Sequence, residues 1–236
     1  MKKFSFLLCV LVLFSGIGKA QIIQNLLNHI TNSAGQNVTS DEVGKGIKEA
    51  LSVGIKNAGA KANKVDGYYK NPLIKIPFPK EVSQVETKLK QMGMTKLVND
   101  FILTINRSAE SAAKEAAPIF VNAITQMSIT DAIGLFKGGD NAATEFLKKT
   151  TTSQLYTAFF PHIKSALDRT DCTKYWTKIT TNYNKIPLVT KVQTDLPKYT
   201  TNKALDGLFM LVAQEESKIR KDPASRVTEL LRKVFG

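Results

Sequence analysis

A carboxylate on the apolar side of a predicted helix is the residue best placed for acid–base chemistry in this sequence. Glu216 falls within a stripe formed, at helical spacing, by Leu205, Phe209, Val212 and Ile219. A carboxylate removed from water needs a cation or several hydrogen-bond donors, or it binds a proton instead. Arg220 follows four residues later, and Arg107 or Arg226 is an alternative partner from another helix. Two hypotheses remain open: a buried ion pair that fixes helix packing, or a general acid with a raised pKa.

Further polar residues are predicted to gather around this carboxylate, between two long helices. The predicted cluster comprises Asn106, Arg107, Glu110, Glu215, Glu216 and Arg220. Such a cluster either ties the two helices together, which we favour, or binds a polar ligand. In an enzyme, Glu216, Glu110 and Arg107 would be the residues of a hydrolase-like site.

The cysteines and histidines lack the spacing of a metal site or a nucleophilic site. Cys172 is the only cysteine besides Cys9, which lies in a predicted signal peptide, so we interpret Cys172 as a packing residue. His29 and His162 each lack a second ligand at zinc-site spacing, and neither has the context of a Ser-His-Asp arrangement. The sequence therefore predicts no metal, no cofactor and no catalytic residue.

A loop rich in aromatic residues and prolines is the better candidate for contact with another molecule. The predicted ligand or partner contacts are Tyr68, Tyr69, Ile74, Ile76 and Phe78. Aromatic residues on rigid loops are common at interfaces because they bury much area with little loss of entropy. The alternative is that the loop covers a groove of its own domain.

The residues from Leu97 to Met127 form the longest amphipathic stretch and must position these groups. Its apolar residues recur at steps of three and four, which predicts a helix packed on its neighbours. Pro118 lacks an N–H and crowds the carbonyl four residues back, so we expect a kink or break near Ala117. Ala109 to Ala117 is alanine-rich, which lets another helix approach closely.

Shorter helices are predicted on both sides of this stretch. Their expected ranges are 41–62 after a capping box at Thr39, 79–93, 128–138, 140–149, a helix from 152 or 153, one from 171, 201–221, and a last helix ending at 235. The prediction is an all-α fold: a single compact domain of about eight to ten helices with one extended Pro/aromatic loop.

The first twenty residues have the pattern of a cleavable secretory signal. Lys2 and Lys3 precede a short apolar run, and small residues stand at Gly18 and Ala20. The expected organisation is a signal peptide at 1–20, an N-terminal segment at 21–38 and an all-α domain at 39–236. An exported protein, periplasmic or extracellular, is therefore predicted, with no transmembrane span in the mature chain.

The chain is strongly basic, with a net charge of +13. Its lysines are spread over nearly every predicted helix, which is common for solubility but also suits an anionic lipid surface. No nucleic-acid recognition motif accompanies the charge, so nucleic acid is not an expected partner.

An ordered series of short motifs resembles one known family. The motifs are Asp66-Gly67-Tyr68-Tyr69, Ile74-Lys75-Ile76-Pro77, Asn106-Arg107-Ser108-Ala109-Glu110, Ala117-Pro118-Ile119-Phe120, Thr130-Asp131-Ala132, Ala142-Ala143-Thr144, Lys203-Ala204-Leu205-Asp206-Gly207-Leu208-Phe209, Glu215-Glu216 and Arg220. From about Thr39 to Phe235 the chain resembles the bacterial family described as domain of unknown function 4197. The resemblance implies an exported α-helical protein with no assigned activity, and it supplies no catalytic residues.

The favoured function is a non-catalytic binding or interaction module for an envelope partner or an amphiphilic ligand. The alternatives are the hydrolase-like enzyme described above and a basic protein that binds the membrane surface. The partner itself is unknown.

Overall fold

A computed structural model gives the fold of the protein. It describes residues 39–79, 82–185, 187–188, 191–192, 195–226, 228–229 and 232, with only the backbone of Lys88. The predicted signal peptide and the segment at 21–38 lie outside the described residues. The described chain is helical and contains no strand, so the predicted all-α fold is confirmed.

The first described helix begins as the sequence predicts. In α2 (Ser40–Asn63), the Thr39 hydroxyl accepts from the Glu42 N–H and the Glu42 carboxylate accepts from the Thr39 N–H, which forms the expected capping box. The aromatic loop follows, and α3 (Ser83–Gln91) comes after it. Gly93, at a φ of 80°, then reverses the chain into α4.

The long amphipathic stretch forms two helices joined by a tighter turn. The helix α4 (Thr95–Ala112) passes through the 3-10 turn η2 (Ala113–Glu115) into α5 (Ala116–Gln126). The turn includes Lys114, whose carbonyl would have received the bond that Pro118 cannot donate. The predicted break is therefore confirmed, and it lies a few residues before Ala117.

The next segment corrects the sequence prediction. After α6 (Ile129–Lys137), the helices predicted at 140–149 and from 152 are one continuous helix, α7 (Ala142–Asp168). Neither Thr152 nor Ser153 begins a new helix, because both lie inside α7, and the Thr152 hydroxyl donates to the Lys148 carbonyl four residues back. The helix also continues through Pro161.

The last long helix begins earlier than predicted. After α8 (Cys172–Tyr183), α9 runs from Leu196 to Lys221 rather than from Thr201. The Asp195 carboxylate accepts from the Lys198 N–H, which caps α9 at this earlier point. A short 3-10 turn η3 (Pro223–Ser225) follows, and part of the helix predicted to end at 235 lies outside the described residues.

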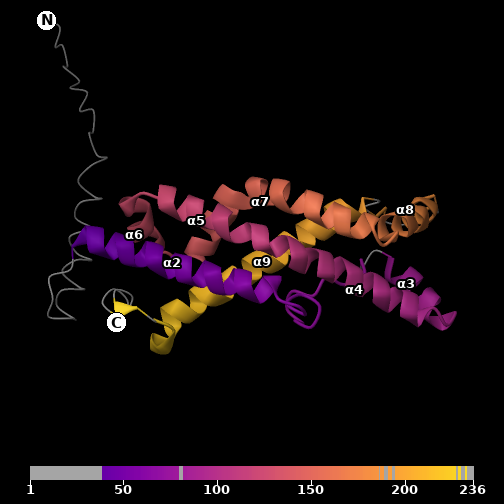
Figure 1. Ribbon diagram of the computed structural model, residues 1–236, viewed down its shortest axis with the longest axis horizontal. Helices are drawn as coiled ribbons and strands as arrows, with labels where there is room; N and C mark the ends of the chain where they lie inside the picture. The colour runs from indigo at the N-terminus through magenta and orange to yellow at the C-terminus, as the bar shows by residue number, and fades with distance from the viewer. Residues whose placement is uncertain are drawn as a thin grey trace, which may run out of the picture.

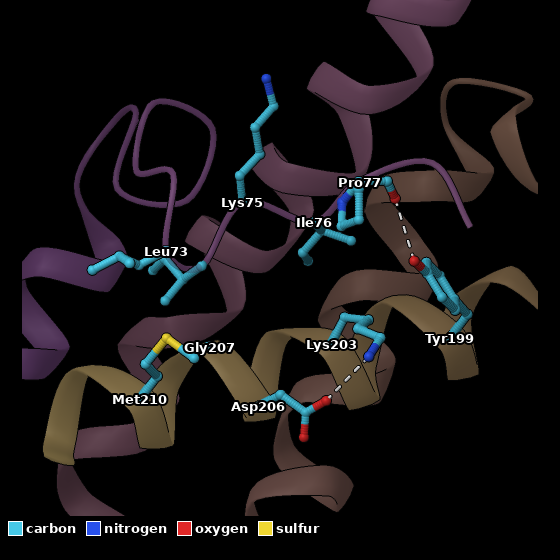
Figure 2. Close-up of a pocket in the computed structure, with 10 residues that line it drawn as sticks. Leu73, Lys75, Ile76, Pro77, Tyr199, Lys203, Asp206, Gly207 and Met210 are labelled. Atoms are coloured by element: carbon cyan, nitrogen blue, oxygen red, sulfur yellow. Dashed lines mark hydrogen bonds and ion pairs between the residues drawn. The ribbon is translucent and has the colours of Figure 1, made fainter. Parts of the chain in front are cut away.

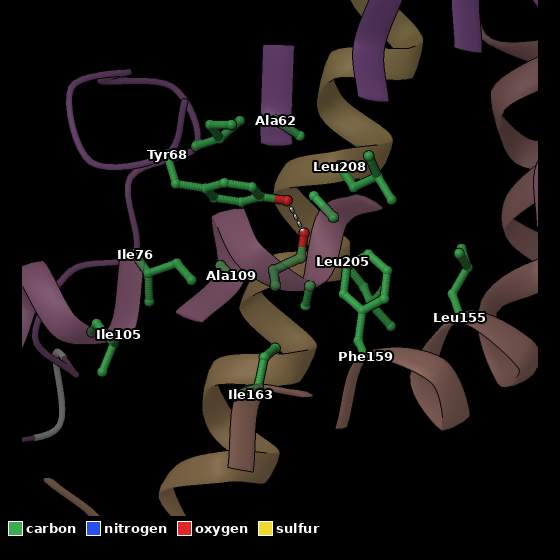
Figure 3. Close-up of a cluster of buried hydrophobic side chains, with 14 of the residues drawn as sticks. Ala62, Tyr68, Ile76, Ile105, Ala109, Leu155, Phe159, Ile163, Leu205 and Leu208 are labelled. Atoms are coloured by element: carbon green, nitrogen blue, oxygen red, sulfur yellow. Dashed lines mark hydrogen bonds between the residues drawn. The ribbon is translucent and has the colours of Figure 1, made fainter. Parts of the chain in front are cut away.

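The long helices run along the protein, and α3 and α8 lie together at one end while α6 lies towards the other (Figure 1). The helix α9 packs against both α2 and α7, and α4 packs against α7. Figure 3 shows the core between them, where the Tyr68 ring enters a cluster with Phe159, Ile163 and Leu205.

Among the described helices, none is by itself long and apolar enough to cross a membrane. Only the Thr95–Gln126 stretch combined with α6, bent by 105° where they meet, meets that criterion.

Candidate functional site

The aromatic loop is attached to α4 by a carboxylate. Glu110, which is buried, accepts from the backbone N–H groups of Tyr68 and Tyr69 at 3.1 and 3.0 Å. Its other oxygen accepts from Arg107 at 2.6 Å, and Arg107 also contacts Asp66 at 2.6 Å. Hydrogen bonds from Lys70 and Arg107 lower the pKa of the Asp66 carboxyl. This group therefore fixes the start of the loop.

A buried amide holds the second half of the loop extended. The Asn106 side chain accepts from the Ile76 N–H at 2.8 Å and donates to the Ile76 carbonyl at 2.8 Å, as a neighbouring strand would. Along this segment the side chains alternate in direction. Ile74, Ile76 and Phe78 are buried, whereas Leu73, Lys75 and Pro77 are exposed.

This packing changes the role of the predicted contact residues. Tyr68 is fully buried and its hydroxyl donates to the Ala204 carbonyl at 2.7 Å, so it is a core residue rather than a contact residue. Burial raises the pKa of this hydroxyl far above its ordinary value. Tyr69 is half-buried, and Ile74, Ile76 and Phe78 present only edges to the grooves described below. For these four, contact with a ligand stays a prediction.

A groove lies between the extended segment and α9, and we call it the loop groove (Figure 2). It has a volume of about 400 Å³ and is lined by Leu73 to Pro77 on one side and by Tyr199, Lys203, Asp206, Gly207 and Met210 on the other. At Gly207 a Cβ would lie 2.8 Å from the Tyr68 ring, so glycine allows this close approach. Lys203 and Asp206 form an exposed ion pair at 3.4 Å along the groove.

Glu216 caps the start of another helix. Its carboxylate accepts from the N–H groups of Ala143 and Thr144 at 3.1 and 2.8 Å, and from the Thr144 hydroxyl at 2.8 Å. Arg220 donates twice to it, at 3.0 and 2.8 Å, and also donates to two carbonyls at the end of α6. These five bonds fill the acceptor capacity of a carboxylate. The cavity beside Glu216 has only about 30 Å³, and Glu216 and Arg220 form the buried ion pair of the first hypothesis.

The predicted polar cluster is divided among three places. Ala204, beside Tyr68, precedes Glu216 by twelve residues. This spacing separates the loop from Glu216 by about 18 Å along α9. Asn106, Arg107 and Glu110 therefore hold the loop, while Glu216 and Arg220 join α9 to α6 and α7. The trio Glu216, Glu110 and Arg107 of the enzyme hypothesis is not brought together.

Glu215 forms the third place, between α9 and α2. Burial would raise the pKa of its carboxyl, but hydrogen bonds from Lys61 and Lys218, and one from Asn57 at 3.2 Å, bring the pKa below its ordinary value. A carboxyl with a lowered pKa stabilises the fold while it is ionised, and this contribution is lost as the pH falls through the folded-state pKa.

We expect Glu215→Gln to lower the free energy of unfolding at pH 7 by about 1–2 kcal/mol, because the three donors lose a charged acceptor. The difference from the parent protein should shrink below about pH 4.5 and disappear at lower pH. Urea unfolding followed by circular dichroism across this range measures it. Glu145→Gln, which removes an exposed carboxylate, is the control, and a difference that persists in acid would contradict the prediction.

A second groove was not predicted from the sequence. It lies between α3, α4 and α8, has about 520 Å³, and is mainly apolar; we call it the aromatic groove. Its lining includes Phe78, Leu89, Leu97, Phe101, Trp176 and Ile179. The centroid of the Trp176 ring lies 5.5 Å from that of Phe101 and 5.7 Å from that of Phe78. Burial raises the pKa of the Cys172 thiol in this lining, which makes it a poor nucleophile.

The described residues contain no group of three or more His, Cys, Asp or Glu side chains arranged to hold a metal ion.

Residues 37–236 match the family described as protein of unknown function (DUF4197). The chain belongs to this family. This confirms the predicted resemblance over nearly the same range. No curated protein and no solved structure matches the chain.

Proposed function

We propose that this family member is an exported, non-catalytic binding module whose loop groove docks a segment of a polypeptide partner. The pattern of the first twenty residues supports export. The observation that carries the binding proposal is the loop groove itself. In this groove, which has a volume of about 400 Å³, a rigid extended segment faces α9.

The extended segment is held before any partner arrives. Asn106 bonds both backbone groups of Ile76, and the Tyr199 hydroxyl donates to the Pro77 carbonyl at 3.3 Å (Figure 2). Glu110 fixes the preceding turn through two backbone N–H groups. A surface ordered in advance loses little conformational entropy on binding, which favours affinity.

The groove offers side-chain recognition rather than strand addition. Pro77 has no N–H, and the Lys75 N–H already donates to the Asn71 carbonyl at 2.8 Å. Added strands depend on main-chain donors of this kind. Leu73 and Met210 are exposed at one end and suit an apolar side chain. The exposed pair of Lys203 and Asp206 contributes little to folding and can exchange its partners, so a carboxylate of the docked segment can bind Lys203.

Selection from a library of random peptides tests this proposal. We expect selected peptides to combine a large apolar residue with a nearby Asp or Glu. Met210→Glu should weaken their binding about tenfold or more, because it places a charge at the apolar end of the groove. Fluorescence anisotropy of labelled peptides measures the affinity.

Val121→Glu provides the matched control, since Val121 is also exposed but lies on α5, outside the loop groove. Peptides that bind the Met210→Glu variant as tightly as the parent protein would contradict the proposal. So would peptides that lose equal affinity for both variants.

A further inference from the structure

One end of the protein exposes a group of large apolar side chains. Met92, Met94, Leu97 and Tyr175 are 69, 41, 53 and 56% exposed, and we call these four residues the end face. Of the nine large hydrophobic residues found exposed among the described positions, these four lie at the α3–α4 turn, on the start of α4 and on α8. Figure 1 shows these elements together at one end. Clustered exposed apolar residues mark interaction surfaces in soluble domains.

The helical geometry joins these residues to the aromatic groove. Met92 and Met94 stand on either side of Gly93, at the turn between α3 and α4. Leu97 follows Met94 by three residues, so the two lie on the same side of the helix start. Leu97 and Tyr175 line the aromatic groove from α4 and from α8. Two of the four end-face residues therefore also line an apolar groove of about 520 Å³, while Met92 and Met94 lie at the adjoining turn.

Positive charge accompanies this apolar surface. The segments 83–104 and 169–185, which contribute α3, the first half of α4 and α8, carry seven Lys and Arg against three Asp and Glu. In α8 the sequence contains Lys174 and Lys178 and no acidic residue. Both lysines are exposed and lie one turn apart, beside the Tyr175 side of the helix.

We propose that the end face docks on an anionic lipid surface. Apolar side chains flanked by lysines suit a bilayer interface, where the apolar groups enter the acyl boundary and the lysines remain among anionic headgroups. Lys174 and Lys178, with no acidic residue on α8, supply the positive charge that complements anionic headgroups. The flexible thioethers of Met92 and Met94 adapt to a fluid surface. This proposal is independent of the loop groove, which is lined by other residues.

Sedimentation with lipid vesicles tests the proposal on the exported protein, with its N-terminus identified by mass spectrometry. Vesicles of phosphatidylcholine with about 30% phosphatidylglycerol should bind at least about tenfold more protein than pure phosphatidylcholine, and added salt should weaken the binding. Trp176 is the only tryptophan and lines the aromatic groove, so lipids with brominated acyl chains should quench its fluorescence.

Two variants locate the contact. Leu97→Glu should weaken vesicle binding about tenfold, because a carboxylate would enter the acyl boundary. The double change Lys174→Glu and Lys178→Glu should weaken it by at least a similar factor, because it replaces attraction by repulsion. All these side chains are exposed, so we expect both variants to fold, and circular dichroism checks this.

Matched changes elsewhere serve as controls. Val121→Glu adds the same charge at an exposed residue of α5, and Lys148→Glu with Lys149→Glu makes the same charge change near the start of α7, which contacts α6. Every variant keeps the same N-terminal residues, so any contribution of those residues to vesicle binding is the same in the variants and in the controls. Equal losses in variants and controls would overturn the proposal. Binding of free laurate without binding to vesicles would also overturn it, and would instead indicate a pocket for a monomeric amphiphile.

Discussion

Replacing Glu216 by alanine is expected to lower the free energy of unfolding by about 3–5 kcal/mol, the range for breaking one side of a buried ion pair. Arg220 would lose its charged partner while its side chain remains only 17% exposed. The N–H groups of Ala143 and Thr144 at the start of α7 would lose their acceptor as well. One substitution therefore loosens the junction of α6, α7 and α9. Urea unfolding followed by circular dichroism measures the change.

An exposed ion pair provides the control for Glu216. Asp140 contacts Lys221 at 2.6 Å near the same junction, but both side chains are more than half exposed. Asp140→Ala should change the free energy of unfolding far less than Glu216→Ala, because a solvent-exposed ion pair contributes little to stability. Glu216→Gln keeps one oxygen acceptor and should fall between the two, which allows a measurement if the alanine variant does not fold. An alanine variant as stable as Asp140→Ala would contradict the structural role of Glu216.

The sequence predicts local features of this fold well, because those features depend on residues close together in the chain. Thr39 with Glu42 signals a capping box, and Pro118 signals a break in the central helix. The apolar spacing along α4 and α5 is confirmed by a buried side that includes Ile105, Phe120 and other residues of the stretch.

Features that depend on tertiary packing were harder to predict. Threonine is a common N-cap residue, so Thr152 suggested the start of a helix. In the structure Thr152 instead lies inside the continuous helix α7, which packs against α4 and α9. The aromatic groove combines Leu89, Phe101 and Trp176, which come from three helices separated in the sequence. These residues are far apart in the sequence and follow no short repeat, so the spacing of apolar residues along the chain could not predict the groove.

Glu216 lies between these two cases. Its position on an apolar stripe, with Arg220 four residues later, signals a buried ion pair from the sequence alone. The sequence could not predict the hydrogen bonds from the start of α7, because Thr144 lies 72 residues before Glu216. Tyr68 is similar, since its type suggests an interface but the distant Ala204 carbonyl makes it a core residue.

Gly67→Ala is expected to lower the free energy of unfolding by about 3 kcal/mol, the upper part of the usual range for steric overpacking. In the structure a Cβ at this position would lie 2.3 Å from the Lys61 carbonyl oxygen and 2.6 Å from that of Ala62. Both are backbone atoms at the end of α2, so they cannot rotate away as a side chain would. Relief requires moving the loop, including the neighbouring Tyr68, whose ring is packed in the core.

Gly59→Ala separates this steric effect from the general effect of adding a methyl group. Gly59 lies inside α2, and no atom is found within 4 Å of a Cβ built there. Alanine should stabilise the helix by about 0.5–1 kcal/mol at such a site. Thermal unfolding of a domain this size should then show a midpoint about 10 °C lower for Gly67→Ala and slightly higher for Gly59→Ala. Similar midpoints for the two variants would mean that the loop does not close over the end of α2 as described, and the rigid wall of the loop groove would lose its support.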